Sequence, residues 1–387
     1  MSLSCKAQAI NDSDIQAVVD VLRSDWLTTG PTVSEFEQAF ADYVGTREAV
    51  SVSNGTAALH AAMFALNIQP GDEVLIPAIT FVATANAVVF QGGRPVFADV
   101  EPDTLLLDPT LLEVKITPRT KGIIAVDYAG QPCDYDALQA IADRHSLRLV
   151  ADACHAVGGE YNGRHVGCLA DLSTFSFHPV KNMTTGEGGM VTTDDTELAK
   201  RMRKFRNHGV ATDFRQREVR GTWFYEMTDL GYNYRLTDLQ CALGMSQLRQ
   251  LPGWIIRRQE IAKRYRAAFA DMPFIEPLKV RDNVSHAYHL FVVRVKLPDL
   301  PEARDTIFKR LRSNDIPVNV HYIPVHLQPF YCQRFGTGPG LCPVAEAAYE
   351  EILSLPIHPN LSDDAVDEIA EHVLKSITIT EPCQLTL

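Results

Sequence analysis

Short apolar runs alternate with helical patterns through the first two thirds of the chain, and this alternation constrains its fold more than any other feature. Apolar runs of about four to eight residues, bounded by turn residues, are typical of buried strands. Strands joined through helices form right-handed β-α-β units and a mostly parallel sheet, so we predict an α/β fold. The expected strands are 48–52, 73–77, 95–100, 122–127, 147–152, 172–177 and 189–194, and the expected helices among them are 56–66, 80–90 and 136–145.

Helices are also expected on either side of this series. Before it, apolar residues spaced i, i+3, i+4 and i+7 predict a helix with a stripe of Ile15, Val18, Val19 and Leu22. Ser34 and Glu37 have the spacing of a capping box, which predicts a second helix that begins at Ser34. After the series, helical patterns cover 195–206 and 236–249, and a separate amphipathic pattern runs from 254 to 271.

The order of elements changes after Pro273 and Pro277, which interrupt the last helical pattern. We therefore place a domain boundary near 255–275, between a large domain of residues 1–260 and a smaller α+β domain of residues 261–387. The elements expected in the smaller domain are strands at 289–297 and 318–323 and helices at 302–313, 343–352 and 363–376.

Composition and charge exclude several classes of protein. The 36 Lys and Arg residues against 48 Asp and Glu residues give a net charge of −12, which argues against nucleic acid as a partner because phosphate binding needs clustered cations. No apolar run approaches the roughly 18 residues of a membrane span, and the first residues lack the apolar core of a signal peptide. The eight cysteines form no C-x-x-C motif, so we expect reduced thiols, no metal site and a cytoplasmic protein.

Asp152 follows an apolar strand in the segment L-V-A-D-A-C-H-A (149–156). An unpaired carboxylate is costly to bury at such a position. The segment alone leaves two interpretations open. Asp152 is either a helix cap or hydrogen-bonded core residue, or it is the partner of a buried cation.

Lys181 lies in the segment S-F-H-P-V-K-N-M-T-T-G-E-G-G (176–189), directly after another expected strand. A lysine in that position is commonly a solvated surface residue. Here, however, Ser176 and His178 precede it and three glycines follow it, and glycines let a backbone approach a ligand closely. A lysine held partly desolvated in such a pocket can act as an amine nucleophile that forms a Schiff base.

The third segment, S-V-S-N-G-T-A-A (51–58), passes from a strand into a helix at Asn54, Gly55 and Thr56. The free amides and the positive dipole end of a helix N-terminus favour an anion such as phosphate. Gly-Lys-Ser/Thr and G-x-G-x-x-G are both absent here, so the turn is neither a P-loop nor a dinucleotide fingerprint. By itself, a turn of this kind can also serve packing alone.

Together the three segments supply what pyridoxal phosphate requires. Its aldehyde forms an imine with an amine such as that of Lys181. A buried carboxylate such as Asp152 keeps its pyridine nitrogen protonated, so that the ring can accept electrons. Its phosphate is suited to the helix N-terminus at Gly55 and Thr56. The sequence therefore predicts a pyridoxal-phosphate site and a chemistry based on Lys181.

The whole sequence resembles the nucleotide-sugar aminotransferases, a family of fold-type-I pyridoxal-phosphate enzymes that includes perosamine, desosamine and aminoarabinose transaminases. The resemblance implies a fold-type-I transferase and covers nearly the whole chain. It rests on an ordered set of segments: W-L-T-T-G-P (26–31), the N-G-T turn, D-A-C-H-A (152–156), the Lys181 segment through G-M-V-T-T (189–193), and G-Y-N-Y-R-L-T-D-L-Q-C-A-L-G (231–244).

The resemblance implies a role for each matching residue. Lys181 would form the imine and act as acid and base for a 1,3-proton shift, Asp152 would pair with the ring nitrogen, and His155 would bond the ring hydroxyl. The other implied cofactor contacts are Gly55, Thr56 and Ser176 at the phosphate, Phe81 and Cys154 at the two ring faces, and Asn233, which would reach the phosphate of the neighbouring subunit in a homodimer. The implied substrate contacts are Trp26, Leu27, Thr28, His321 and Tyr322 at the sugar nucleotide, and Arg235 at an anionic group of the amino donor or the nucleotide.

Several of these residues have an ordinary structural alternative. His155 and Phe81 could be core residues, and Asn233 could cap a helix. Arg235 could be a surface residue in an ion pair. His321 and Tyr322 also fit an edge strand with alternating faces.

Within the family, D-Y-A-G (127–130), V-H-Y-I-P (320–324) and the Lys181 segment are most similar to the C4 transaminases of pseudaminic acid biosynthesis. Those enzymes act on UDP-4-keto-6-deoxy-N-acetyl-altrosamine, and L-glutamate would supply the amino group. The main alternative is another 4-keto sugar on a UDP, dTDP or GDP carrier. A sugar 3-dehydratase is disfavoured because such relatives carry His in place of Lys181, and a non-catalytic regulator is disfavoured because no DNA-binding extension is visible.

Overall fold

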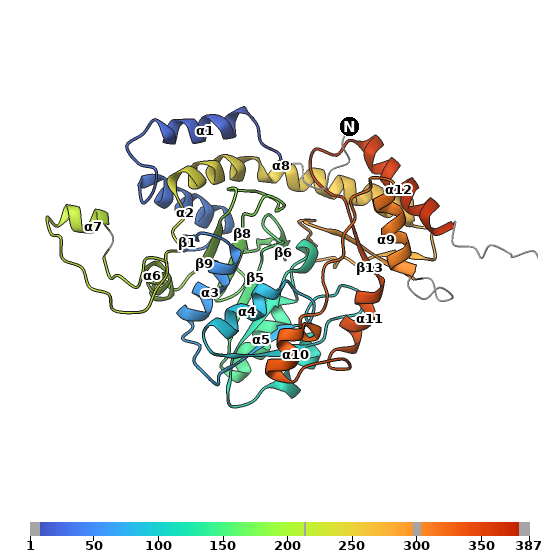
Figure 1. Ribbon diagram of the computed structural model, residues 1–387, viewed down its shortest axis with the longest axis horizontal. Coiled ribbons are helices and arrows are strands. Elements are labelled where there is room, and N and C mark those ends of the chain that lie inside the picture. Colours follow the sequence, from blue (N-terminus) through green and yellow to red (C-terminus); the bar gives the residue numbers. More distant parts are fainter. Residues whose placement is uncertain (1–7, 213, 297–302, 379–387) are drawn as a thin grey trace, which may run out of the picture.

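The computed structural model describes residues 8–212, 214–296 and 303–378. Its central sheet has seven strands in the order β1-β9-β8-β5-β4-β2-β3 (Figure 1). Among these described strands, β9 alone runs opposite to the other six, so the sheet is mostly parallel as predicted. The strands are β1 (Glu48–Val52), β2 (Glu73–Pro77), β3 (Arg94–Ala98), β4 (Thr120–Val126), β5 (Arg148–Asp152), β8 (Leu172–Ser176) and β9 (Gly189–Thr193).

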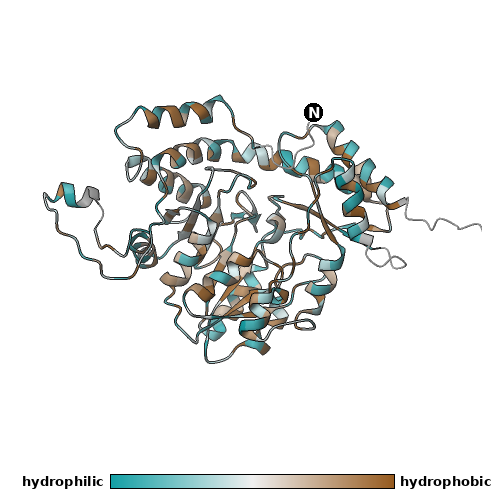
Figure 2. Ribbon diagram, in the orientation of Figure 1, coloured by the Kyte–Doolittle hydropathy of each residue, from teal (hydrophilic) through white to brown (hydrophobic). Residues whose placement is uncertain are grey.

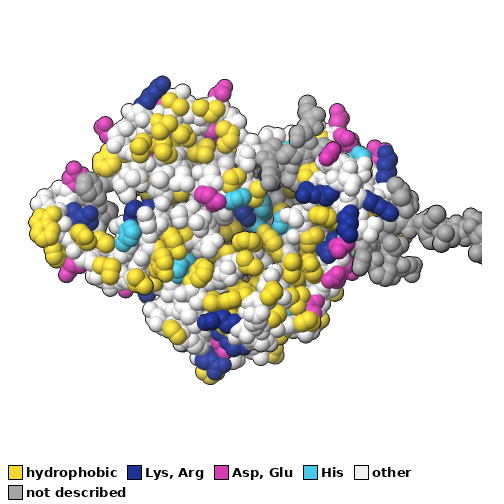
Figure 3. All heavy atoms as spheres, viewed as in Figure 1, with side chains coloured by type: hydrophobic (Ala, Val, Ile, Leu, Met, Phe, Trp, Pro, Cys, Tyr) yellow, Lys and Arg dark blue, Asp and Glu magenta, His cyan; other side chains and the backbone are white. Residues whose placement is uncertain are grey.

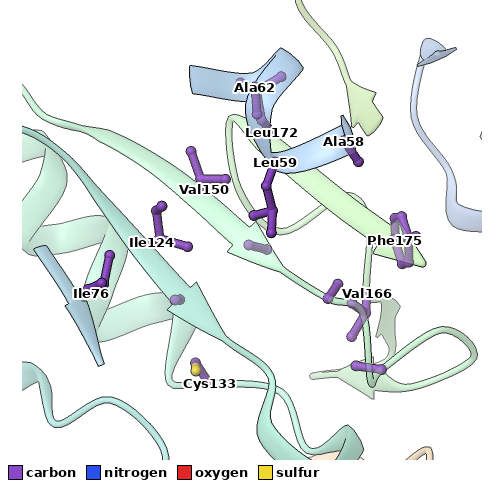
Figure 4. Close-up of a cluster of buried hydrophobic side chains, with 14 of the residues drawn as sticks. Ala58, Leu59, Ala62, Ile76, Ile124, Cys133, Val150, Val166, Leu172 and Phe175 are labelled. Atoms are coloured by element: carbon purple, nitrogen blue, oxygen red, sulfur yellow. The ribbon is translucent and has the colours of Figure 1, made fainter. Parts of the chain in front are cut away.

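Helices pack against this sheet through small and aliphatic side chains. Figure 4 shows Ala58, Leu59 and Ala62 of α3 facing Val150 of β5 and Leu172 of β8. Burying each side chain of Leu or Val size contributes roughly 1.5–3 kcal/mol, and the alanines let the helix approach closely. Figure 2 shows that hydrophobic residues follow the strands of the central sheet. The helices in this part are α3 (Gly55–Ala65), α4 (Val82–Phe90), α5 (Tyr135–His145) and α6 (Thr196–Phe205), close to their expected positions.

Helix α2 (Pro31–Val44) begins earlier than its sequence predicted. Ser34 lies inside the helix, so the predicted capping box with Glu37 is wrong. The cap comes instead from a distant side chain, because the carboxylate of Asp238 accepts a hydrogen bond of 2.7 Å from the amide of Gly30. A local pattern gives no sign of such a tertiary cap.

Helix α8 (Asp238–Phe269) is one continuous helix, whereas the sequence predicted separate segments at 236–249 and 254–271. Pro252 lies inside it. An interior proline costs a helix about 3 kcal/mol. Contacts with α1 and α2 and with α12 hold α8 in place, and this packing outweighs the cost. Figure 1 shows α8 running along the molecule from the large sheet to the C-terminal helices.

Residues after α8 build a second hydrophobic core and also contribute to the first. The second core contains Ile261 and residues of a three-stranded sheet, β10-β12-β13. The division into domains 1–260 and 261–387 stays a prediction. The elements after α8 are β10 (Ile275–Pro277), β11 (Val284–Ser285), β12 (Phe291–Val295), α9 (Ala303–Ser313), α10 (Pro329–Phe335), α11 (Pro343–Glu351), β13 (Ile352–Leu355) and α12 (Asp363–Thr378). Earlier in the chain, β6 (Glu160–Tyr161) and β7 (Arg164–His165) form a short hairpin.

The strand predicted at 318–323 is wrong. Within the described residues, this segment makes a single bridge, between Asn319 and Ser354. The reason is that side chains take the place of a strand ladder. The hydroxyl of Tyr128 donates to the carbonyl of His321, and Nδ1 of His321 lies 2.8 Å from Oγ of Ser354.

Two exposed apolar regions stand out on the surface. Helix α1 (Asp12–Leu22) forms as predicted, but Ile15 and Leu22 of its apolar stripe are 55% and 57% exposed. Asp14 faces α8 instead, because Nε2 of Gln247 donates to its carboxylate at 2.7 Å. The second region is the projecting segment around α7 (Phe214–Val219), where Trp223 is 85% exposed. Figure 3 shows hydrophobic side chains gathered in both places.

Two further sequence expectations concern thiols and membranes. Six cysteines are free thiols in the described residues, while Cys5 and Cys383 lie outside them. None of the helices in residues 8–212, 214–296 and 303–378 combines the length and apolarity needed to cross a membrane. In the same ranges, no group of three or more His, Cys, Asp or Glu side chains could hold a metal ion.

Candidate active site

The three segments singled out in the sequence meet at one edge of the central sheet. Asp152 ends β5, Lys181 lies in the loop after β8, and Gly55 begins α3 directly after β1. These three strands point the same way, so their carboxyl ends share an edge, which is where ligands gather in such sheets.

Asp152 is a buried carboxylate with neutral donors on both oxygens. Asp152 is only 5% exposed. Oδ2 accepts a hydrogen bond of 2.6 Å from the hydroxyl of Thr84, and Oδ1 accepts a longer one of 3.3 Å from the amide of Cys154. These bonds fix the orientation of the carboxylate, and a cationic ring nitrogen would offset its burial.

Lys181 is half-buried beside this carboxylate. Burial lowers the pKa of its ammonium below the ordinary value of a lysine, while the Cys154 thiol and the Asp152 carboxylate act in the opposite direction. No hydrogen bond or ion pair of its Nζ is seen among the described residues. A lysine with a lowered pKa and an unengaged amine is suited to attack a carbonyl carbon.

The loop that carries Lys181 is held by its neighbours. Nδ2 of Asn182 donates to the carbonyl of Ala287 at 3.0 Å, and the hydroxyl of Thr184 donates to the carbonyl of Phe177 at 2.9 Å. Gly186 then has φ +82°, a conformation that favours glycine. These contacts keep the lysine at the sheet edge rather than on a solvated loop.

The N-terminus of α3 closes the other side of the site. Asn54 caps the helix by accepting a hydrogen bond of 2.8 Å from the amide of Ala57. The amides of Gly55 and Thr56 in the first turn have no partner inside the helix. A Cβ atom on Gly55 would lie 2.8 Å from Cβ of Ser176, so glycine is needed for this close approach.

Histidine and aromatic side chains surround the amine. Nε2 of His155 lies 3.1 Å from the hydroxyl of Tyr322, and the ring of Tyr322 lies 5.9 Å from that of Phe81. Burial, with the charge of Lys181, holds the pKa of His155 well below its ordinary range and lowers that of His321 to about 4. Both imidazoles are therefore neutral near pH 7.

The arrangement fits pyridoxal phosphate. A buried carboxylate, a half-buried amine, and a helix N-terminus with Gly55 against Ser176 lie on one sheet edge. In addition, Nδ1 of His155 is buried without a hydrogen-bond partner among the described residues, which suits a polar group of a bound ring. Figure 3 shows histidine side chains beside Lys or Arg side chains near the centre of the face that is viewed.

Comparisons with known proteins agree with this geometry. The profile of the DegT/DnrJ/EryC1/StrS aminotransferase family matches residues 8–374. The spore coat polysaccharide biosynthesis protein SpsC of Bacillus subtilis is 43% identical over 366 residues, which cover 94% of each chain.

The chain belongs to the DegT/DnrJ/EryC1/StrS aminotransferase family.

Solved structures of similar aminotransferases extend this result. PseC of Helicobacter pylori, an aminotransferase involved in the biosynthesis of pseudaminic acid, has 34% sequence identity and a TM-score of 0.91, and the match covers 98% of this chain and all of PseC. The putative sugar aminotransferase Spr1654 of Streptococcus pneumoniae, in its PLP form, has 35% identity and a TM-score of 0.92 over 97% of this chain and 98% of Spr1654. The protein is therefore a pyridoxal-phosphate-dependent sugar aminotransferase with the predicted fold.

A second group of predicted residues in this aminotransferase lies around the start of α8. The amide of Asp238 donates to the carbonyl of Leu27 at 3.1 Å, and Thr28 pairs with Thr237. Asn233 is exposed and pairs with Asn207. The amide of Ser53 donates to the carbonyl of Tyr234 at 2.8 Å, which places residues 233–235 beside the turn before α3. Within the described residues, no hydrogen bond or ion pair joins Leu27, Thr28, Asn233 or Arg235 to Lys181.

Arg235 is not a surface residue in an ion pair, the alternative that the sequence left open. None of the ion pairs among the described residues includes it, and its Nη1 donates to Oδ1 of Asn207 at 2.8 Å. Burial and the charge of Arg206 lower the pKa of its guanidinium. A half-buried cation without an acidic partner is available to an anionic group.

Sequence reasoning missed several side chains of this aminotransferase site. Thr84 lies three residues after Phe81 on α4, and that helical spacing could have indicated it. His289 lies 4.5 Å from His155, ring centre to ring centre, and no local pattern of the sequence indicates it.

Proposed function

We propose that this aminotransferase moves the amino group of L-glutamate to C4 of a UDP-linked 4-keto-6-deoxy-N-acetylhexosamine. The product would be UDP-4-amino-4,6-dideoxy-N-acetyl-altrosamine of pseudaminic acid biosynthesis, made in the cytoplasm. The observation that carries the chemistry is the half-buried Lys181 amine beside the buried Asp152 carboxylate. The similarity to PseC, an aminotransferase involved in pseudaminic acid biosynthesis, supports the choice of sugar.

Lys181 and the residues around its amine would each have a separate role in the reaction. When bound, pyridoxal phosphate supplies a carbonyl carbon for amines and a ring that stabilises negative charge. Lys181 would hold the cofactor and later carry a proton on Nζ, Asp152 would keep the ring nitrogen charged, and His155 would bond the ring hydroxyl. Overall, glutamate and the 4-keto sugar become 2-oxoglutarate and the 4-amino sugar.

The remaining contacts fix the ligands in place. The phosphate would lie at the first turn of α3, and Phe81 and Cys154 would pack on the two ring faces. Burial of Gly55 against Ser176 supports this placement of the phosphate. The proposed phosphate contacts are Gly55, Thr56 and Ser176, and the proposed substrate contacts are Trp26, Leu27, Thr28, Arg235, His321 and Tyr322.

Another sugar nucleotide is the second candidate. SpsC, which is 43% identical, is named for spore coat polysaccharide biosynthesis rather than for pseudaminic acid. Similarity of this degree to proteins with different names favours a 4-keto sugar on another carrier or a different epimer as the alternative.

A panel of 4-keto sugars tests the proposed substrate. Purified enzyme loaded with pyridoxal phosphate is given L-glutamate and UDP-, dTDP- or GDP-linked 4-keto-6-deoxy sugars, and formation of 2-oxoglutarate is measured. We expect the highest kcat/KM with UDP-4-keto-6-deoxy-N-acetyl-altrosamine and no turnover by Lys181→Ala. A dTDP or GDP sugar with a higher kcat/KM would instead establish the alternative carrier.

We also propose a homodimer in which Asn233 serves the site of the partner subunit. The exposed apolar residues of the projecting segment that precedes Asn233 in the chain, such as Trp223, support an interface on this side of the molecule. Co-expression of differently tagged Lys181→Ala and Asn233→Ala chains provides a test. In a hybrid dimer, one site then has both native residues, so activity should return to about half of that of the wild type. If Asn233 acts within its own chain, the hybrid stays as inactive as its parents.

A further inference from the structure

The segment H-A-Y-H-L (286–290) forms a turn directly behind the loop of Lys181. Tyr288 in its middle has φ +46°, a left-handed conformation that is uncommon for an aromatic residue. The surrounding structure must hold this turn in place, since such a conformation costs of the order of 1–3 kcal/mol.

Three separate elements fix the backbone of this turn. Asn182, next to Lys181, donates to the carbonyl of Ala287 at 3.0 Å. Arg258 of α8 donates to the carbonyl of Tyr288 at 2.9 Å. The amide of Ala287 in turn donates to the carbonyl of Gly130 at 2.9 Å. The turn is therefore tied to the Lys181 loop, to α8 and to the segment after β4.

His289 is the side chain that this turn presents to the site. It is 7% exposed, and its ring centre lies 4.5 Å from that of His155, with the planes tilted by 47°. Nδ1 of both rings is buried without a hydrogen-bond partner among the described residues. Burial, together with the charge of Lys181, holds the pKa of His289 well below its ordinary range. A neutral imidazole thus packs against His155.

We propose that His289 is a positioning residue, which fixes the ring of His155 so that His155 can engage the cofactor. The inference rests on the proposed role of His155 at the ring hydroxyl. Contact with Tyr322 constrains one nitrogen of His155, and contact with His289 constrains its ring. A histidine held on two sides keeps one orientation, and misplacement of such a group weakens binding and catalysis.

His286 provides a matched control in the same turn. It is also 7% exposed, but its Nδ1 accepts a hydrogen bond of 2.9 Å from the amide of Tyr288, and its ring stacks on Tyr288 at 3.9 Å. His286→Ala therefore removes an equally buried imidazole from the same turn while it leaves in place the ring that packs against His155.

The test is a double-mutant cycle on the full chain. His289→Ala, His289→Phe, His155→Ala, the double variant His155→Ala/His289→Ala and the control His286→Ala are compared. The measurements are the dissociation constant of pyridoxal phosphate, the pH midpoint of the absorbance change of the bound cofactor, and thermal unfolding. His289→Phe keeps a ring at the site and remains informative if His289→Ala does not fold.

We expect His289→Ala to weaken cofactor binding about tenfold and to move the pH midpoint, and His289→Phe to have a smaller effect on binding. The same change should have little further effect once His155 is removed, because the two residues act as a unit. His286→Ala should lower thermal stability but change the dissociation constant less than about twofold.

Two results would show whether the proposed role of His155 or that of His289 is wrong. If His155→Ala changes neither binding nor the pH midpoint, the proposed role of His155 is wrong. If His155→Ala has the expected effect but His289→Ala behaves as His286→Ala does, or if the effects of His155→Ala and His289→Ala simply add, the positioning role of His289 is wrong and the proposed function is unaffected.

Discussion

The neighbouring strands β4 and β5 each lead to a buried aspartate: Asp127 directly follows β4, and Asp152 is the last residue of β5. Of these two aspartates, only Asp152 lies beside the amine of Lys181. Asp127 after β4 accepts hydrogen bonds of 2.9 Å from the amide of Cys133 and the hydroxyl of Tyr135. Asp152 at the end of β5 accepts from Thr84 at 2.6 Å and from the amide of Cys154 at 3.3 Å, and it lies beside Lys181.

The difference shows that an aspartate after an apolar strand has no fixed role. The loop after β4 folds back and satisfies Asp127 with its own amide and the hydroxyl of Tyr135. Asp152, in contrast, accepts a single short hydrogen bond, and its carboxylate lies in the same site as the amine of Lys181. A structural acid and a proposed cofactor-binding acid therefore share one sequence pattern.

Replacing Asp152 should have the largest effect on turnover. Asp152→Asn removes the charge that would pair with the ring nitrogen, and breaking such a buried pair costs about 3 kcal/mol or more, which corresponds to roughly a 100-fold loss of kcat. Steady-state kinetics with pyridoxal-phosphate-loaded enzyme measures this. Asp127→Asn is the matched control, and equal losses of turnover in the two variants would remove the distinction between these acids.

The second prediction concerns pH and Asp127. Burial raises its pKa to about 7 in the folded protein, although hydrogen bonds from Cys133 and Tyr135 oppose the shift. A carboxyl whose folded pKa is raised binds its proton more tightly when folded, so its contribution to stability is full at low pH and is lost as pH rises towards 7.

Chemical unfolding at pH 5 and pH 7.5 measures this contribution. The free energy of unfolding of the wild type should decrease between pH 5 and pH 7.5. In Asp127→Asn this decrease should be smaller, by an amount on the order of 2 kcal/mol. Asp152→Asn serves as the comparison. An unchanged slope in Asp127→Asn would mean that Asp127 is ionised throughout this range.

Removing the donor to Asp152 should have a smaller effect. Thr84→Val keeps the side-chain shape but deletes a hydrogen bond to a charged group, which contributes about 1.5–3 kcal/mol. We expect roughly a tenfold loss in kcat or in affinity for pyridoxal phosphate. Thr80→Val is the control, since Thr80 contacts Thr84 and not the carboxylate. A greater loss in Thr80→Val than in Thr84→Val would contradict this assignment.

Tyr322→Phe should have the smallest effect and distinguishes two roles of that tyrosine. Its hydroxyl lies 3.1 Å from Nε2 of His155, so its loss should weaken cofactor binding by about threefold, as expected for one neutral hydrogen bond. An increase in KM for the sugar nucleotide alone, with cofactor affinity unchanged, would show that Tyr322 acts on the substrate instead.

Much of the fold was predictable because each strand and helix of the sheet carries a local pattern. The alternation of strands and helices can be read from short stretches of sequence, and so can the start of α3 at Asn54 and Gly55. Tertiary effects produced the errors. Asp238 caps α2 from a distant helix, packing keeps α8 continuous across Pro252, and the Tyr128 hydroxyl occupies the carbonyl of His321 where a strand was expected.

The site was predictable to a similar extent and for the same reason. Asp152, Lys181 and Gly55 each stand at a strand end, where the sheet order places ligand-binding residues together. Thr84 and His289 come from a helix face and an irregular turn, and only the assembled fold brings them to the site. Arg235 could be separated from a surface ion pair only once its neighbours were known.

Chemical trapping tests most directly whether Lys181 is the amine that holds the cofactor. The protein loaded with pyridoxal phosphate is reduced with borohydride and digested, and the peptides are identified by mass spectrometry. We predict that the pyridoxyl mass lies on the peptide that contains Lys181 and disappears in Lys181→Ala. A label on another lysine, or a wild-type protein that binds no cofactor and gives no label, would contradict the assignment.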